Sequence, residues 1–329
     1  MEFIGHQNTK DRIKVAVNSA DKRNTAIPHM LLTGAAGCGK TTTARWLATM
    51  GGYEFLPASP LELKTKKNVY DLLGKMNIVG YNEKGDRISK VKPTIIFFDE
   101  VHQLPVIGQE ILGLAMERFI LEADMPNKLI WLPYFTIVGA TTDDGQLTKP
   151  FRERFKLRFI YEPYKAKDMY EIVRFHAIKN KLPITDGAIK NIIRRSRGVP
   201  RMMVGYLEII RDIMISDNVS MITEDLVDFA FDIIGIDGTG LTKVEIKILK
   251  SLLAANTAIG LDNLAITTNE SPKTISQTLE PFLIRRGLIV RTGKGRTITE
   301  KGIKYLEENG HLDKKTSNKK FIDVSYERD

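Results

Sequence analysis

The chain is short of cysteine, since its 329 residues contain one, Cys38. A single thiol excludes an internal disulfide and leaves no cysteine cluster for a metal. Cys38 itself is either small apolar filler or an oxidisable thiol. The sequence also lacks an apolar run of about 18 residues and a secretory leader, so we expect a cytoplasmic protein with no membrane partner.

Acidic side chains are the minority among the charged ones. The sequence has 40 Asp and Glu against 49 Lys and Arg, a formal net charge of +9, and a pI near 9.3. This balance favours a polyanionic partner, although it does not distinguish DNA from RNA or from a basic surface with no partner. Hydrophobic residues make up 43% of a chain too long for one typical core, so we expect two or three domains.

The most informative segment is 34–41, which matches the phosphate-binding pattern G-x-x-x-x-G-K-[ST]. Its flanks predict a short buried strand over 29–33 and a helix over 42–48. Glycine lets backbone N–H groups approach a polyphosphate closely, because no Cβ stands in the way. In this pattern Lys40 reaches the β- and γ-phosphates and the Thr41 hydroxyl ligates Mg²⁺, so we expect a nucleoside triphosphate to bind.

A second segment supplies two carboxylates. The apolar run 94–98 is typical of a central parallel strand buried on both faces, and Asp99 and Glu100 follow at its end. We expect Asp99 to hold the Mg²⁺ shell and Glu100 to orient and deprotonate the attacking water. Taken alone, the two acids could equally be a solvated strand end, but the phosphate loop upstream favours hydrolysis.

Two further segments carry candidates that would contact the triphosphate. The expected strand 135–140 ends in a polar run containing Thr142, which could sense the γ-phosphate. Arg152 and Arg154 then flank Glu153, and a guanidinium group suits the charge on a transferring phosphoryl group. Without context, a surface ion pair is the commoner role for such arginines.

The order of these segments resembles an AAA+ ATPase, and within that class the chain is similar to the RuvB family, the motors that drive branch migration of Holliday junctions. The resemblance runs from about residue 3 to about residue 308. Its last two matches lie outside the ATPase core and separate this family from other AAA+ proteins. The matching segments are 3–5, 34–41, 99–102, 115–117, 139–142, 152–155, 195–201, 235–241, 280–284 and 287–296.

The resemblance implies an α/β fold, with an AAA+ P-loop core, a helical lid domain and a C-terminal winged-helix domain. It also implies ATP and Mg²⁺ as cofactors. The implied catalytic residues are Lys40, Asp99, Glu100, Thr142 as first sensor, and Arg154 as an arginine finger reaching the neighbouring subunit's nucleotide. The implied nucleotide-binding residues are Gly37, Gly39, Lys40, Thr41, Thr42, Tyr164 and Arg201, the last as second sensor. The implied metal-holding residues are Thr41 and Asp99.

Alternating strands and helices, then helices alone, predict the domain order. Glycines within 235–240 mark a hinge after the lid, and a polar stretch, 82–92, is inserted before the hydrolytic strand. The expected parts are 1–160, the large AAA+ nucleotide-binding domain; 161–236, the small helical lid; 237–310, the winged-helix DNA-binding domain; and 311–329, a polar, disordered tail.

The last domain is expected to end in a basic hairpin. Its three expected helices are 243–253, 261–265 and one from Pro272 through Leu283, followed by strands at 288–292 and 296–299. Glycines in the turn 293–295 allow positive φ. Arg291, Lys294 and Arg296 on this hairpin suit salt-sensitive, largely sequence-independent contact with a phosphate backbone; a merely solvated wing is the alternative.

A finger acting between subunits requires an oligomer, and the resemblance implies a homo-hexamer around duplex DNA that acts on a four-way junction. Family members also carry a hairpin that docks the junction-binding partner RuvA. The corresponding segment 119–134 is shorter here, and its tip at 124–128 differs, so the need for a RuvA-like loading protein stays open.

Two other functions remain open beside a DNA-dependent ATPase that translocates DNA. One is an AAA+ loader or remodeller that places another protein on DNA, which would share every ATPase motif. The other is a DNA-binding regulator whose ATP site only switches assembly. The presence of both Glu100 and Arg154 argues against the regulator, since a switch needs slow hydrolysis.

Overall fold

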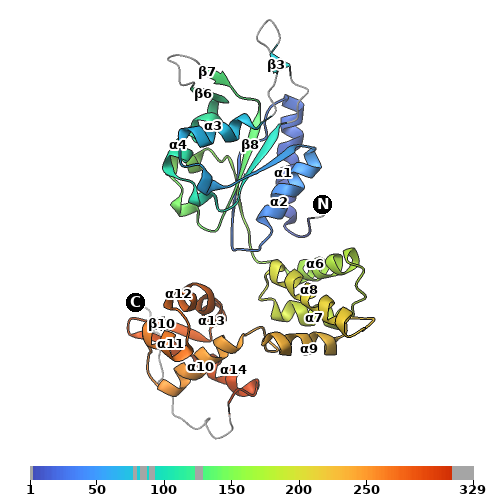
Figure 1. Ribbon diagram of the computed structural model, residues 1–329, viewed down its shortest axis with the longest axis vertical. Coiled ribbons are helices and arrows are strands. Elements are labelled where there is room, and N and C mark those ends of the chain that lie inside the picture. The colour runs from blue at the N-terminus through green and yellow to red at the C-terminus, as the bar shows by residue number, and fades with distance from the viewer. Residues whose placement is uncertain (1–2, 77–79, 82–86, 89–92, 123–128, 313–329) are drawn as a thin grey trace. The chain divides into compact units, whose positions relative to one another are not determined.

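The computed structural model describes residues 3–76, 80–81, 87–88, 93–122 and 129–312 (Figure 1). The expected insertion 82–92, apart from 87–88, lies outside the described residues, and so do the hairpin tip 124–128 and the tail from 313 onward. The chain divides into two compact units. Unit 1 is Met1–Asn180 with Gly198–Gly205, and unit 2 is Lys181–Arg197 with Tyr206–Asp329.

Unit 1 is built on a parallel sheet of five strands in the order β2-β5-β8-β1-β9. The strands are β1 (Met30–Thr33), β2 (Glu54–Ala58), β5 (Thr94–Phe98), β8 (Phe135–Thr141) and β9 (Leu157–Ile160). Because β8 lies between β5 and β1, the segments that follow these three strands meet at one edge of the sheet.

Helices cover both faces of this sheet (Figure 1). They are α1 (Gln7–Arg23) and α2 (Lys40–Gly51) on one face, and α3 (Lys66–Gly74) and α4 (Val106–Arg118) on the other. Strand β5 is buried on both faces, which accounts for its run of apolar residues. Ile95 and Phe97 pack into the core under α1 and α2, whereas Ile96 and Phe98 pack into the core under α3 and α4. The predicted α/β class and buried central strand are confirmed.

Shorter elements complete unit 1. They are η1 (Pro60–Glu62), β3 (Gly80–Tyr81), β4 (Arg87–Ile88), η2 (Val101–Gln103), β6 (Ile120–Glu122), β7 (Leu129–Trp131), η3 (Asp144–Gln146), α5 (Lys149–Glu153) and α6 (Ala166–Lys179). Strands β6 and β7 form an antiparallel hairpin.

The expected lid segment is helical. After α6 come α7 (Asp186–Arg195), α8 (Pro200–Ser216) and α9 (Glu224–Ile234), of which α8 begins in unit 1 and continues in unit 2. Threonine side chains cap two of these helices: Thr185 accepts from the Ala188 N–H, and Thr223 from the Leu226 N–H. Among the described residues, no helix is both long and apolar enough to span a membrane.

A winged helix follows in unit 2. Its elements are α10 (Lys243–Ala255), α11 (Leu261–Thr268), α12 (Pro272–Thr274), a π-helical turn η4 (Ile275–Leu279), α13 (Glu280–Arg285), β10 (Ile289–Thr292), β11 (Gly295–Ile298) and α14 (Glu300–Glu308). A capping box between Thr242 and Glu245 begins α10.

The two turn glycines of the hairpin behave differently. Gly295 has φ of 137°, and a Cβ there would lie 2.3 Å from the Ile259 carbonyl oxygen. Gly293 has no positive φ, contrary to the expectation from sequence. Gly295 is needed because the backbone of Ile259 pairs with Arg296 beside it.

Candidate nucleotide site and basic wing

The phosphate loop joins β1 to α2 and is shaped by glycine. Gly37 and Gly39 have φ of 78° and 94°. A Cβ on Gly34 would lie 2.7 Å from Tyr161 Cβ, and one on Gly39 would lie 2.6 Å from Tyr164 Oη. Side chains are therefore excluded at Gly34 and Gly39, which lets the loop backbone approach phosphate oxygens closely.

The first turn of α2 supplies the polar groups. The Lys40 side chain is buried, and its Nζ donates to the carbonyls of Gly34 at 2.6 Å and Ala35 at 3.0 Å. The ammonium thus lies against the loop that is predicted to bind the phosphates. Thr41 and Thr42 follow at the helix N-terminus, half-buried, where the helix dipole favours an anion.

Glu100 and Thr142, predicted as base and first sensor, are in direct contact. The backbone N–H and Oγ1 of Thr142 donate to Glu100 Oε2 at 3.1 and 3.0 Å. Glu100 has a left-handed backbone with φ of 50°, which is uncommon outside glycine and concentrates at functional sites. Asp99, directly before it, is exposed at the end of β5. The fold therefore brings both carboxylates and the sensor to one edge of the sheet.

Sequence analysis missed a further residue of this cluster. His102 Nδ1 lies 3.2 Å from Glu100 Oε2 and 2.8 Å from the Thr141 hydroxyl oxygen. The imidazole thereby restricts the carboxylate. His102 ends the matching segment 99–102, which was the available sequence signal, but no role was predicted for it.

Tyr161 and Tyr164 enclose the loop. Tyr161 Oη donates to Thr43 Oγ1 at 2.5 Å, and burial raises the pKa of this phenol. Cys38 is buried in the same core, and burial also raises the pKa of its thiol. A buried, protonated thiol is a poor nucleophile, so the structure favours the role of Cys38 as filler.

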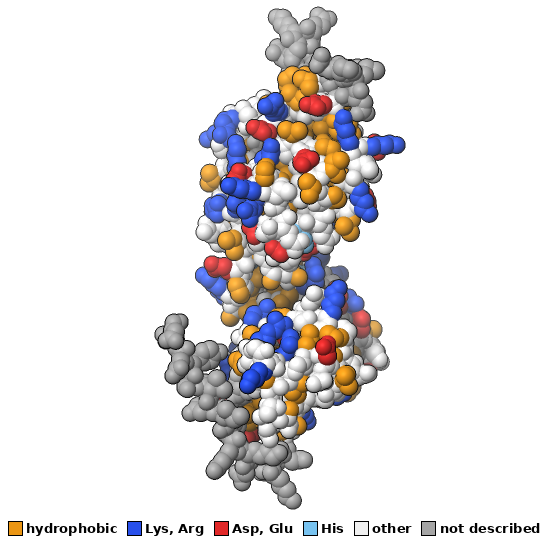
Figure 2. Space-filling view, turned by 90° about the vertical axis from the view of Figure 1, so that its left-hand side faces the viewer, with side chains coloured by type: hydrophobic (Ala, Val, Ile, Leu, Met, Phe, Trp, Pro, Cys, Tyr) orange, Lys and Arg blue, Asp and Glu red, His pale blue; other side chains and the backbone are white. Residues whose placement is uncertain are grey.

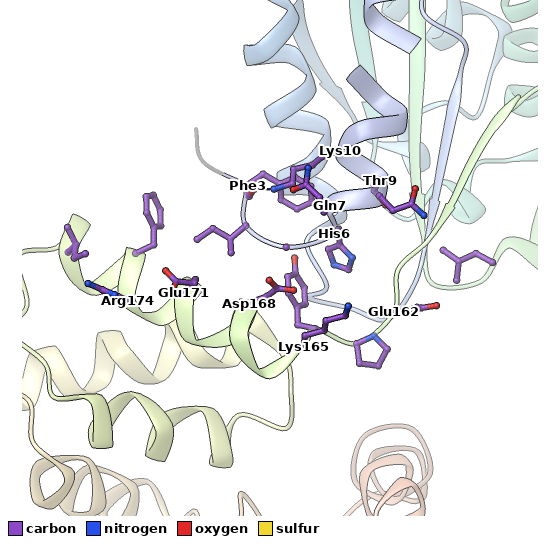
Figure 3. Close-up of a pocket in the computed structure, with 18 residues that line it drawn as sticks. Phe3, His6, Gln7, Thr9, Lys10, Glu162, Lys165, Asp168, Glu171 and Arg174 are labelled. Carbon is purple, nitrogen blue, oxygen red and sulfur yellow. Dashed lines mark hydrogen bonds between the residues drawn. The ribbon is translucent and has the colours of Figure 1, made fainter. Parts of the chain in front are cut away.

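A cavity of about 1050 Å³ lies beside this loop, between the N-terminal segment and α6 (Figure 3). Phe3, Gly5 and Tyr164 line it, together with His6. The His6 ring meets the rings of Tyr161 and Tyr164 edge-on at 4.7 and 4.4 Å between centroids. Burial lowers the pKa of His6, so the ring is neutral at pH 7 and this end of the cavity is aromatic, whereas charged side chains such as Lys165 and Asp168 line the rest.

Arg201, predicted as second sensor, lies in the first turn of α8 and packs against the phosphate loop. A Cβ on Gly37 would lie 2.9 Å from Val199 Cγ1 and 3.1 Å from Arg201 Cβ. This contact is inside unit 1. The start of α8 therefore packs on the loop backbone.

Arg154, predicted as finger, contacts none of these loop residues. Its Nη1 donates to the Pro150 carbonyl at 2.8 Å, and its Nη2 lies 3.5 Å from Glu117 Oε2 on α4. Phe151 and Phe155 on either side are buried and pack ring against ring, which fixes the short turn that carries Arg154. The half-buried guanidinium thus packs against Gly113 and Glu117 of α4.

In the winged helix, the basic hairpin has an acidic partner that sequence analysis missed. Glu280, fully buried on α13, bonds Arg291 through Oε2 at 2.7 Å and Arg296 through Oε1. The Arg291 side chain keeps 53% of its surface exposed, whereas that of Arg296 keeps 12%. Lys294 is exposed at the tip. Arg291 and Lys294 are therefore available to a polyanion, and Arg296 mainly neutralises Glu280.

Together these features define a class of protein. A parallel sheet ordered β2-β5-β8-β1-β9, a glycine loop after β1, an acid pair after β5 and a threonine after β8 are the parts of an AAA+ P-loop ATPase. Three family models match consecutive parts of the chain: the Holliday junction DNA helicase RuvB P-loop domain over 1–160, the RuvB AAA lid domain over 164–237, and the RuvB C-terminal winged helix domain over 238–307. The chain belongs to the RuvB family.

Individual relatives agree. The chain is 32% identical over 313 residues to the Holliday junction branch migration complex subunit RuvB of Streptococcus equi subsp. equi, covering 93% of this chain and 89% of the relative. A solved structure of the RuvB Holliday junction branch migration motor of Thermotoga maritima superposes with a TM-score of 0.74 at 31% identity, covering 93% of this chain and 95% of that one.

Proposed function

We propose that this chain is an ATP-driven motor of the RuvB type, which moves duplex DNA and drives branch migration of Holliday junctions in recombination and repair. The observation that carries the proposal is the presence, in one chain, of a Glu100–Thr142 hydrolytic pair over a glycine loop and of a basic wing. The match of RuvB family models along 1–160, 164–237 and 238–307 supports both halves.

The loop fits a nucleoside triphosphate, since Gly37 and Gly39 adopt the positive φ of a phosphate-binding loop and the Lys40 ammonium lies against it. Lys40 would bind the β- and γ-phosphate oxygens, and Thr41 with Asp99 would hold Mg²⁺, which supplies neutralisation of phosphate charge. The part of the cavity lined by Phe3, His6 and Tyr164 would take the base, so adenine would stack there on aromatic rings.

Hydrolysis would then depend on how the chain holds its own groups. Glu100 would orient the attacking water and take its proton, and the two hydrogen bonds from Thr142 would fix the carboxylate. Arg154, at the end of α5, packs against α4 and would serve the nucleotide of a neighbouring subunit, where its charge would stabilise the transferring phosphoryl group. This assignment makes the working unit a homo-oligomer, and family membership favours a hexamer.

DNA would be held through its backbone. Arg291 and Lys294 are exposed on the wing and would contact phosphates, whereas Arg296 would act by neutralising Glu280. Such contacts depend on salt and little on sequence, as a translocating motor needs.

A RuvA-like loading protein would dock on the β6–β7 hairpin. Leu129, Ile130 and Trp131 are large apolar residues exposed in succession on β7, and exposed apolar patches of this kind mark protein contacts. Further hydrophobic side chains are exposed on the same face of unit 1, that of α3 and α4 (Figure 2).

The test is ATP-driven dissociation of a synthetic four-way junction by the purified chain, at low and moderate salt, with DNA-stimulated ATPase measured on the same samples. Arg154→Ala is expected to lower ATP turnover by about 10³-fold or more while ATP binding persists. Arg152→Ala is the matched control, because it removes a neighbouring arginine from the same turn and should keep turnover.

Junction dissociation that needs ATP and Arg154 would support the motor acting without a loading protein. Rapid ATP hydrolysis with intact junctions, also after a RuvA-like protein is added, would contradict the motor and favour a loader or remodeller. Slow ATP hydrolysis that DNA does not stimulate would favour a regulator.

A further inference from the structure

The loop 195–197, at the end of α7, is fastened to the turn that connects α9 to the winged helix. Arg195 Nε donates to the Asp237 carbonyl at 3.0 Å, and Arg197 Nε donates to the Gly240 carbonyl at 3.0 Å. Gly240 has φ of 93°, and a Cβ there would lie 2.5 Å from the Arg195 carbonyl oxygen. Only glycine allows these two backbones to approach so closely.

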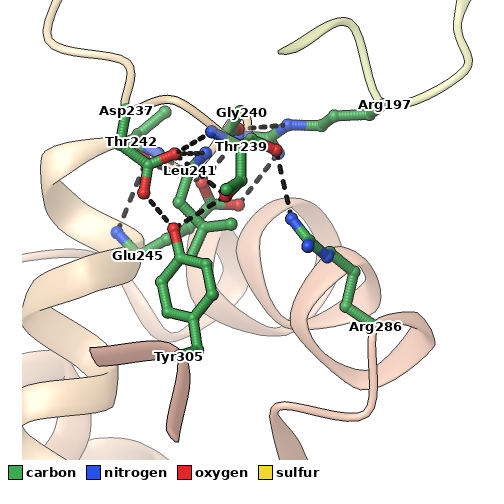
Figure 4. Close-up of polar contacts among 9 residues, drawn as sticks. All are labelled: Arg197, Asp237, Thr239, Gly240, Leu241, Thr242, Glu245, Arg286 and Tyr305. Carbon is green, nitrogen blue, oxygen red and sulfur yellow. Dashed lines mark hydrogen bonds and ion pairs between the residues drawn. The ribbon is translucent and has the colours of Figure 1, made fainter. Parts of the chain in front are cut away.

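Arg197 also reaches into the winged helix itself (Figure 4). Its Nη1 and Nη2 donate to Glu245 Oε1 and Oε2 at 2.8 and 2.6 Å, and its guanidinium stacks 4.2 Å from the centre of the Phe282 ring. Glu245 is fully buried at the start of α10. A bidentate bond to a buried carboxylate fixes direction as well as distance, so α10 and α13 are held to the loop.

The turn itself, where the sequence predicts a hinge at 235–240, is held by several hydrogen bonds. Asp237 Oδ1 accepts from the N–H groups of Thr239 and Leu241, both at 2.9 Å, and Asp237 Oδ2 bonds the Tyr305 hydroxyl on α14 (Figure 4). Arg286 Nη1 donates to the Thr239 carbonyl at 3.1 Å. Burial acts to raise the pKa of Asp237, but these hydrogen bonds outweigh it and lower the pKa, so the carboxylate stays charged.

Two to four residues beyond Arg197, the same stretch of chain reaches the phosphate loop. Val199 and Arg201 pack on Gly37 inside unit 1, whereas Arg195 and Arg197 belong to unit 2. The chain passes between the units at Arg197 and Gly198, which both have left-handed backbones with φ of 57° and 73°. A Cβ at Gly198 would meet nothing within 4 Å, so this point is locally open.

We propose that residues 195–201 are a coupling segment, in which Arg197 is the positioning residue that makes the winged helix follow changes at the phosphate loop. Motion is then concentrated at Arg197–Gly198, and the turn 237–241 moves as part of the winged helix. The inference rests on the proposed motor function for its purpose, but its geometry concerns this chain alone.

Hydrogen exchange on the full chain tests where motion occurs, without any requirement for motor activity. Amides in peptides covering 236–245 are expected to exchange at the same rate, within about threefold, with ADP, with a non-hydrolysable ATP analogue or with neither. Exchange in peptides that include Gly198 is expected to change with nucleotide. A rise of about tenfold or more at 236–245 on nucleotide binding would overturn the proposal, because the turn would then be the hinge.

Arg197→Gln tests the consequence. Basal ATPase and DNA binding are expected to stay within about twofold of the native chain, while junctions dissociated per ATP fall about tenfold or more. Arg194→Gln is the matched control, since Arg194 bonds Asn191 within its own helix. Native-like yield per ATP in a folded Arg197→Gln would overturn the coupling role.

If Arg197→Gln does not fold, Glu245→Gln replaces it as the test variant, because it keeps one of the two oxygens that accept from the Arg197 guanidinium. The exchange experiment uses the native chain and does not depend on either variant. A native chain that dissociates no junction would contradict the proposed function, whereas the exchange pattern would still decide the coupling segment.

Discussion

At the residue scale, His29 shows how a buried ring can link elements without taking part in chemistry. Its Nδ1 accepts from the Ile137 N–H at 2.9 Å, so the proton is on Nε2, which donates to the Met116 carbonyl at 3.0 Å. The ring thereby joins β8 to α4 beside the start of β1. Both bonds require neutral imidazole, and burial lowers the pKa of His29 to about 4.

This ring should make stability depend on pH. The unfolded His29 binds a proton near pH 6.5 and the folded one near 4, so between these values the unfolded state holds more protons. Stability from His29 is present above 6.5 and is lost as the pH falls, by about 2 kcal/mol between pH 7 and pH 5. Urea unfolding at both values checks this. His29→Gln keeps a donor and an acceptor but cannot titrate, so an unchanged pH dependence in that variant would contradict the assignment.

Thr142 provides a second residue-scale prediction. In Thr142→Val the side-chain bond to Glu100 Oε2 is lost, while the backbone bond persists. One hydrogen bond to a charged acceptor contributes about 1.5–3 kcal/mol, so we expect kcat to fall about 10- to 100-fold. Because the loop itself is untouched, the Kd for ATP should change less than about threefold. A variant that loses ATP binding instead would show that Thr142 shapes the loop.

At the element scale, the sequence predicted those helices, strands and turns that depend on neighbouring residues. The glycine loop, the buried β5 and the helices of the winged domain follow from periodicity and turn residues, and all are present. The hydrogen bonds that hold the turn 235–240 could not be predicted, because they come from Tyr305 and Arg197, which are far away in sequence. The Glu280 partner of the wing was missed for the same reason.

The wing yields a prediction that separates exposed basic residues from one that neutralises a buried carboxylate. Lys294→Ala should leave stability unchanged and lower the slope of log affinity against log salt by about 1 for a DNA duplex. Arg291→Ala should do the same to the slope with a modest loss of stability. Arg296→Ala should mainly destabilise the winged helix, by about 3 kcal/mol, because Glu280 loses a buried partner.

Urea unfolding and salt-dependent duplex binding on the three variants check these outcomes. If Arg296→Ala kept native stability and lost one phosphate contact, the Glu280 pair would be incidental, and Arg296 would join Arg291 and Lys294 as a DNA contact.

At the scale of the whole molecule, the question is whether one subunit completes the active site of the next. Within the described chain, the Arg154 guanidinium contacts Pro150 and Glu117, and Lys40 bonds the phosphate loop. The residues proposed for catalysis are therefore divided between two regions of unit 1. The proposed ring would resolve this separation, since the predicted finger of one copy could lie against the loop of its neighbour.

Mixing two inactive variants tests that division directly. Glu100→Gln removes the base but keeps the finger, and Arg154→Ala removes the finger but keeps the base. In randomly mixed oligomers about a quarter of the interfaces pair an intact base with an intact finger, so DNA-stimulated ATPase should recover to about that fraction of the native rate. If Arg154 served its own subunit, no mixture could exceed the inactive parents, because each polypeptide would carry a defective site. Recovery would therefore place the finger between subunits and make the oligomer the catalytic unit.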